Sequence, residues 1–99
     1  MSLEFHPAVQ SDLSDALDYY RKEGGPNLSE RFEKEFRACL SAIKAAPARF
    51  PYYLGSETLR RIRLPNFPYI MVYRERTEVV RVTVLKHEKR HPRFGIRRE

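Results

Sequence analysis

Apolar residues recur every three or four positions along two stretches of the N-terminal half, which predicts two amphipathic helices. The first stripe consists of Val9, Leu13, Ala16, Leu17 and Tyr20, and the second of Leu28, Phe32, Phe36, Cys39, Leu40 and Ile43. Gly24-Gly25-Pro26 interrupts the pattern between them, and Pro47 ends the second helix near Ala46. We therefore predict a helical hairpin. Three aspartates lie off the first stripe and predict a solvated acidic face: Asp12, Asp15 and Asp18.

The remaining segments alternate apolar and polar residues with a period of two, which predicts β-strands. A short strand spans Leu3–His6, and three longer ones lie near residues 58–64, 69–75 and 78–86, separated by connections short enough for antiparallel pairing. We predict an α+β fold of one domain, residues 1–99. In this fold an N-terminal strand, a two-helix hairpin and a three-stranded antiparallel meander form one sheet, with the helices packed on one face.

The last strand has three valines on one side, and we expect this side to face the helices: Val80, Val82 and Val84. The opposite face of the sheet then displays a row of arginines, Arg61, Arg63 and Arg81. Two further arginines, Arg60 and Arg74, have the wrong parity for that face and lie at strand ends. The sequence thus predicts an open sheet face that is rich in arginine.

Charge is distributed unevenly along the chain. Residues 1–50 contain seven Lys or Arg against eight Asp or Glu, a balance of −1, and residues 51–99 contain twelve against five, a balance of +7. A basic half beside a nearly neutral half favours a polyanion or an acidic protein as partner. The alternative is a basic protein whose charge only keeps it soluble.

The single cysteine, Cys39, lies on the apolar stripe of the second helix, which predicts a buried structural thiol rather than a nucleophile. One cysteine forms no internal disulfide, so a reducing compartment fits the sequence. The first residues lack the basic and apolar segments of a signal peptide, and no apolar run approaches the length of a membrane span. We expect a cytoplasmic protein that binds no membrane.

The order of strand, two helices and three strands, with its spacing, resembles the RelE/ParE superfamily of bacterial type II toxins. The resemblance spans nearly the whole chain and is closer to the ParE-like, plasmid stabilization branch than to the ribonuclease toxins. The residues that carry it are Asp12-Leu13 and Tyr19-Tyr20, Arg31-Phe32, Pro47-x-Arg49-Phe50-Pro51, Arg60-Arg61, Phe67-Pro68-Tyr69-Ile70-Met71-Val72-Tyr73-Arg74 and His87-x-x-Arg90-His91-Pro92-Arg93.

The resemblance implies a toxin that arrests growth and is neutralised by a cognate antitoxin protein, with which it forms a hetero-oligomer. In the ParE branch the target is DNA gyrase. In the RelE branch the toxin is a ribosome-dependent endoribonuclease that cleaves mRNA without a metal. The resemblance implies no cofactor and no metal site in either branch, and a non-toxic binding module that retains the fold is a third alternative.

If the chain is a ribonuclease, its catalytic candidates are His87 for proton transfer and Arg81 for phosphate binding. The alternative for His87 is a structural role at the end of its strand. We expect the following residues to bind the partner or nucleic acid: Arg60, Arg61, Arg63, Arg74, Lys86, Arg90 and Arg93. No tyrosine follows Arg74, which departs from the ribonuclease pattern and favours action by binding. We expect residues 86–99 to be mobile until a partner orders them.

Overall fold

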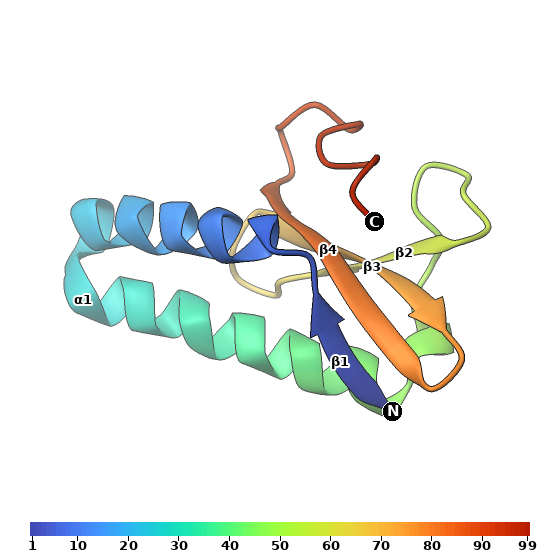
Figure 1. The fold of residues 1–99 in the computed structure, drawn as a ribbon. Coiled ribbons are helices and arrows are strands. Elements are labelled where there is room, and N and C mark those ends of the chain that lie inside the picture. The colour runs from blue at the N-terminus through green and yellow to red at the C-terminus, as the bar shows by residue number, and fades with distance from the viewer.

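A helical hairpin packs on one face of a four-stranded sheet (Figure 1) in the computed structural model, which describes residues 1–99. The elements are β1 (Ser2–Phe5), α1 (Ala8–Ala45), a short 3₁₀ helix η1 (Pro47–Arg49), β2 (Leu59–Arg63), β3 (Tyr69–Arg76) and β4 (Val79–His87). The predicted α+β architecture is confirmed. None of the helical segments combines the length and the hydropathy that crossing a lipid bilayer requires.

The two predicted helices are the two arms of α1, which bends sharply at Gly25 (Figure 1). Gly25 has φ = 79° and ψ = −176°, a conformation that glycine adopts without the steric penalty a Cβ brings, and Pro26 follows it. The chain therefore reverses direction at Gly25 and is helical on both sides of this residue. Both apolar stripes face the sheet, and their buried members are Val9, Ala16, Phe32, Phe36, Cys39 and Ile43.

The strands are ordered β1-β4-β3-β2, with β2, β3 and β4 antiparallel, as the meander predicts. The pairing of β1 with β4 is parallel and was not predicted from the sequence. It extends from Ser2 opposite Val79 to Phe5 opposite Val82. Beyond Val82, the edge of β4 is not covered by a strand, so other groups must bond its backbone there.

A β-bulge interrupts β4 between Val82 and Val84. Val72 of β3 lies opposite Val84, whereas the next residue, Tyr73, lies opposite Val82, so Thr83 is the extra residue. Val80 and Val82 belong to the core beneath the helices, but Val84 lies in a second cluster. The prediction that all three valines face the helices was therefore wrong, because one inserted residue reverses the alternation.

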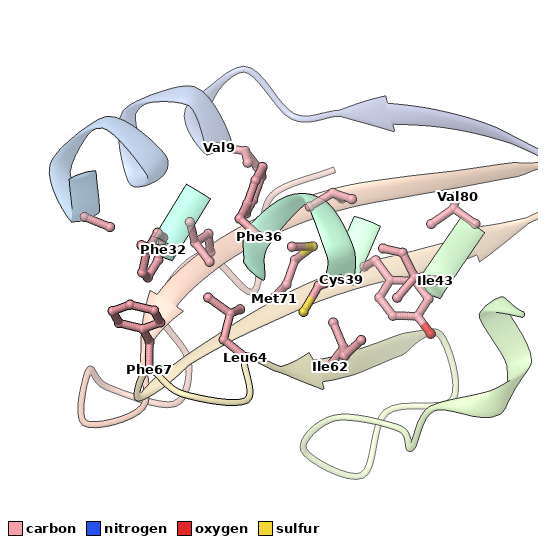
Figure 2. Close-up of a cluster of buried hydrophobic side chains, with 14 residues drawn as sticks. Val9, Phe32, Phe36, Cys39, Ile43, Ile62, Leu64, Phe67, Met71 and Val80 are labelled. Carbon is pink, nitrogen blue, oxygen red and sulfur yellow. The ribbon is translucent and has the colours of Figure 1, made fainter. Parts of the chain in front are cut away.

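The main core fills the space between the hairpin and the sheet. Figure 2 shows Cys39 and Ile43 of the second arm in the core near Met71 of β3 and Ile62 of β2, while Phe36 lies beside Val9 of the first arm. Tyr73 is also fully buried there, and its hydroxyl donates a hydrogen bond of 2.6 Å to the carbonyl oxygen of Pro47. This bond fixes the start of η1 against the sheet.

The opposite sheet face, here called the tail face, carries the second apolar cluster: Tyr53, Leu59, Ile70, Val72 and Val84. Residues 88–99, here called the tail, fold back over the sheet (Figure 1). Phe94 and Ile96 of the tail pack against the second apolar cluster. Gly95 makes the close approach possible, because its φ is 73° and a Cβ there would lie 2.7 Å from Cγ2 of Val84. The tail thus has packing contacts within the chain itself, whereas the sequence led us to expect a segment that only a partner orders.

Candidate functional site

Basic residues surround the apolar centre of the tail face instead of forming an open row. Arg61 lies opposite Val72, and Arg63 lies opposite Ile70, so both arginines are on the tail face as predicted. Arg74 lies opposite Arg81 on the same face. The parity assigned to Arg74 was therefore wrong, because a strand that is apolar on both sides gives no reliable parity.

The tail divides these arginines into two groups. Arg61 and Arg63 lie near the end of the sheet where β3 begins and β4 ends, whereas Arg74 and Arg81 lie toward the other end. The second apolar cluster, with Phe94 and Ile96 over it, occupies the space between them. The predicted open arginine face is therefore two separate basic sites, and no continuous row of guanidiniums is exposed.

Arg60 lies on the helix side of β2, in agreement with its predicted parity, since it pairs with the buried Tyr73. Its guanidinium donates to the carbonyl oxygen of Phe50 at 2.6 Å and to the hydroxyl of Tyr52 at 3.0 Å, and it lies 4.0 Å from the centre of the Tyr52 ring. Glu75 pairs with the same guanidinium at 3.5 Å. Arg60 therefore anchors the loop before β2, and most of its guanidinium is already bonded within the chain rather than free to bind a partner.

Lys86 and Arg63 are also occupied within the chain. Lys86 is 4% exposed, and its Nζ donates to the carbonyl oxygens of Arg90 and His91, each at 3.2 Å. Arg63 donates to the carboxylate of Glu88 and, at 3.0 Å, to the carbonyl oxygen of its neighbour Leu64. Both side chains hold the beginning of the tail in place, so the structure gives them a role that the sequence did not predict.

Arg74 and Arg81 are partly satisfied. Arg74 donates to Oγ1 of Thr58 at 3.1 Å, but its buried Nε has no hydrogen-bond partner. Arg81 donates to the backbone oxygen of Glu99, and its nearest carboxylate, on Glu4, is 3.9 Å away. Two guanidiniums directly opposite each other repel, so an anion would stabilise this end of the face.

Arg61 is the tail-face arginine whose guanidinium makes no hydrogen bond or ion pair within the chain, although the residue is half-buried; its backbone N–H donates to the carbonyl oxygen of Pro51 at 3.1 Å. It borders a hollow of about 380 Å³ at the end of the tail face. The hollow is lined by Tyr53, Leu54, Arg61, Arg63, Ile70, Lys86, Glu88 and Pro92. An uncompensated cation therefore lies beside apolar side chains.

His87 lies on the other side of the sheet, where its ring packs edge-on against Tyr69 with 5.3 Å between the centroids. Its Nδ1 accepts a hydrogen bond from the backbone N–H of Lys89 at 3.0 Å, so the neutral ring carries its proton on Nε2. The ring borders a small hollow that Asp15 and Arg90 also line. Burial, followed by the neighbouring Tyr19 and Asp15, raises the pKa of Tyr69.

The two remaining basic candidates lie on the tail. Arg90 stacks its guanidinium 3.8 Å from the centre of the Phe94 ring. Arg93 is exposed and borders a hollow with His6 and Arg97. Neither residue joins Arg61 or Arg81 in one site.

The structure does not bring the two catalytic candidates together. His87 and Arg81 are six residues apart on the extended β4, which corresponds to about 20 Å. They also lie on opposite faces, because Arg81 is beside Arg74 on the tail face and His87 contacts Tyr69 on the helix side. One phosphate group cannot contact both side chains, so this pair forms no catalytic centre for RNA cleavage.

Sequence reasoning missed two features of this region. Asp12, expected on a solvated face, is only 9% exposed at its side chain and pairs with Arg98 of the tail at 2.6 Å. Leu54 adopts φ = 54° in the loop before β2. Neither feature has a signal in the sequence, apart from Gly55, which marks a turn at this loop.

The chain matches the family model described as the ParE toxin of the type II toxin–antitoxin system parDE over residues 3–92. Among solved structures, it is similar to a chain of the chromosomal ParDE TA system from P. aeruginosa. That match has a TM-score of 0.77 and 15% sequence identity, and it covers 88% of this chain and 95% of that chain. At this identity the likeness concerns the fold. No curated protein sequence matches the chain.

Proposed function

Because the chain belongs to the ParE toxin family, we propose that it arrests growth by binding a DNA-processing target such as DNA gyrase, and that a cognate antitoxin neutralises it. The observation that carries the choice of mechanism is the separation of His87 from Arg81 on opposite faces of the sheet. A ribonuclease needs a proton donor and a charged group at the same phosphate. A toxin that acts by binding needs neither.

The exposed surface supports action by docking. Tyr52 and Leu54 are 50% and 47% exposed in the loop before β2, and Leu54 borders the same hollow as the unpaired guanidinium of Arg61. Aromatic residues, arginine and exposed apolar side chains are the groups that contribute most to protein interfaces. Leu54 and Arg61 border the hollow of the tail face, whereas Tyr52 packs on Arg60 beside it.

The antitoxin is the second partner that we propose. The similar solved chain comes from a ParDE toxin–antitoxin system, so an equivalent partner here would form a hetero-oligomer with the toxin. The balance of +7 over residues 51–99 favours an acidic segment as the part of the antitoxin that covers the sheet.

Two assays of the purified protein test the proposal directly. The first adds it to DNA gyrase, plasmid DNA and ATP, and we expect cleaved plasmid to accumulate with increasing dose. The second adds it to a reconstituted translation system and maps mRNA ends by primer extension, and we expect the mRNA to stay intact. New ribosome-dependent 5′ ends with an unaffected gyrase would overturn the proposal in favour of an endoribonuclease.

Expression of variants in cells separates the same two mechanisms. We expect His87→Ala to arrest growth as strongly as the wild type, because a docking mechanism does not use its Nε2. Relief of arrest by this variant, with its circular dichroism spectrum unchanged, would count against action by binding alone. A chain that causes no growth defect without its antitoxin would be a non-toxic binding module.

A further inference from the structure

Leu54 combines backbone strain with exposure. Its φ of 54° lies in the left-handed region, which costs a residue with a Cβ roughly 1–2 kcal/mol, and its bulk makes it a poor choice there. Its side chain is 47% exposed and belongs to neither apolar cluster. The packing of the chain therefore does not account for a leucine at this position, where asparagine or glycine would be less strained.

The hollow beside Leu54 offers two kinds of contact. Its floor includes the buried apolar side chains of Tyr53 and Ile70. Its charged wall contains Arg61, whose guanidinium has no partner within the chain, whereas Arg63 and Lys86 are satisfied by Glu88 and by tail carbonyls. One free guanidinium therefore lies next to an apolar floor and an exposed leucine.

We propose that this hollow, called here the Leu54–Arg61 site, docks an acidic peptide segment of a partner protein. A carboxylate of the segment pairs with Arg61, and an adjacent apolar side chain packs on Leu54 and into the hollow. Desolvation by the apolar neighbours strengthens the ion pair relative to one on the open surface. The proposal deepens the proposed function by giving the chemistry of the partner segment, and it does not depend on which target the toxin binds.

The charge pattern favours a protein over a nucleic acid at this site. A nucleic-acid backbone presents a series of phosphates, and its binding requires several cations that are free to neutralise them. Here a single guanidinium is free, and the rest of the lining is apolar or already paired. One carboxylate flanked by apolar residues matches this arrangement.

Two variants remove the proposed contacts without disturbing the fold. Leu54→Asn deletes the apolar side chain but tolerates φ = 54°, so we expect its melting temperature to equal or exceed that of the wild type. Arg61→Gln deletes the charge. Arg76→Gln is the matched control, because Arg76 is an exposed arginine at the far end of β3.

The test is a titration of isotopically labelled protein followed by nuclear magnetic resonance of its methyl groups. The probes are a blocked peptide of alternating leucine and aspartate, the same peptide with asparagine for aspartate, and a single-stranded oligonucleotide of about ten nucleotides. We expect the acidic peptide to shift the methyl signals of Leu54 and Ile70. Its affinity should fall about fivefold with the asparagine peptide, with Arg61→Gln and with Leu54→Asn, and stay within about twofold with Arg76→Gln.

Three results would overturn the proposal. The first is equal binding of the acidic and asparagine peptides, and the second is the absence of shifts at Leu54 and Ile70 up to about 1 mM peptide. The third is an oligonucleotide that causes the same shifts with a steep salt dependence, which would make the site a nucleic-acid surface. Growth arrest and gyrase inhibition are measured separately, so a failed titration and a failed toxin assay are distinguishable.

Discussion

Asp12 on the first arm of α1 and Arg98 in the tail form a partly buried ion pair, with 2.6 Å between Oδ2 of Asp12 and Nη1 of Arg98. The pair lies at the edge of β4 that β1 leaves uncovered. There Asp12 accepts the backbone N–H of Leu85 at 3.1 Å, and Arg98 donates to the carbonyl oxygen of Thr83 at 3.1 Å. Two side chains thus satisfy the backbone next to the bulge and join the hairpin, the sheet and the tail.

We predict that Asp12→Asn lowers the free energy of unfolding by about 3 kcal/mol, because it leaves the guanidinium of Arg98 largely buried without a counter-charge. The measurement is chemical denaturation followed by circular dichroism. Asp18→Asn is the control, since Asp18 pairs with Arg21 while both side chains are more than half exposed. Its cost should stay below about 0.5 kcal/mol. Equal losses of unfolding free energy in the two variants would show that the buried ion pair stabilises the fold no more than the exposed one.

The docking of the tail depends on Gly95. Gly95→Ala introduces a Cβ 2.7 Å from the side chain of Val84 at a φ of 73°, so we expect lower stability and faster amide exchange at Phe94 and Ile96. Gly55→Ala is the control, because Gly55 has a similar φ of 69° and nothing within 4 Å of an added Cβ. The control should lose only the roughly 1–2 kcal/mol of left-handed strain. If both variants lose the same amount, contact with Val84 does not constrain the tail.

Tyr73 makes the stability dependent on pH in the alkaline range. Burial raises its pKa from the ordinary value of 10.0 to about 12, although the nearby Arg60 acts in the opposite direction. Below about pH 10 the tyrosine is protonated in both the folded and the unfolded chain, so its full contribution to the free energy of unfolding is present. As the pH rises from about 10 to about 12, the unfolded chain ionises first, so stability falls.

We therefore expect the melting temperature of the wild type to drop over this window, and Tyr73→Phe to show a smaller drop. The variant also loses the hydrogen bond to the carbonyl oxygen of Pro47, which should cost about 1–2 kcal/mol at neutral pH. Melting curves of both proteins between neutral pH and about pH 11 test the prediction. If the melting temperatures of the two proteins fall in parallel with pH, the loss of stability at alkaline pH comes from other tyrosines.

Cys39 should be unreactive in the folded protein. Its side chain is 4% exposed, and burial, together with the charge of Glu35, raises the pKa of its thiol to about 11. Since the thiolate is the reactive form, we expect a thiol reagent at about pH 8 to label Cys39 only through unfolding. Labelling rates measured across a denaturant series test this prediction. A rate that does not change with denaturant concentration would show that the thiol is accessible in the folded protein.

Local periodicity was sufficient to predict the elements and the two apolar stripes. Phe32, Phe36 and Ile43 recur at helical spacing, and that spacing by itself selects the face of the helix that is buried. Arg61 and Arg63 were assigned to the correct face of β2 for the same reason, since side chains alternate along a regular strand. The order of the elements also indicated the family that the chain belongs to.

The sequence alone thus determined the helices, the strands and the basic character of the C-terminal half, because these depend on residues close together in the chain. Tertiary structure decided the bulge at Thr83, which moved Val84 to the tail face and placed Leu85 beneath the helices. It also decided that the tail covers the arginine face, through contacts such as that between Asp12 and Arg98. Asp12 and Arg98 are 86 positions apart, and a local sequence pattern does not predict which distant groups will pair their charges and hydrogen bonds.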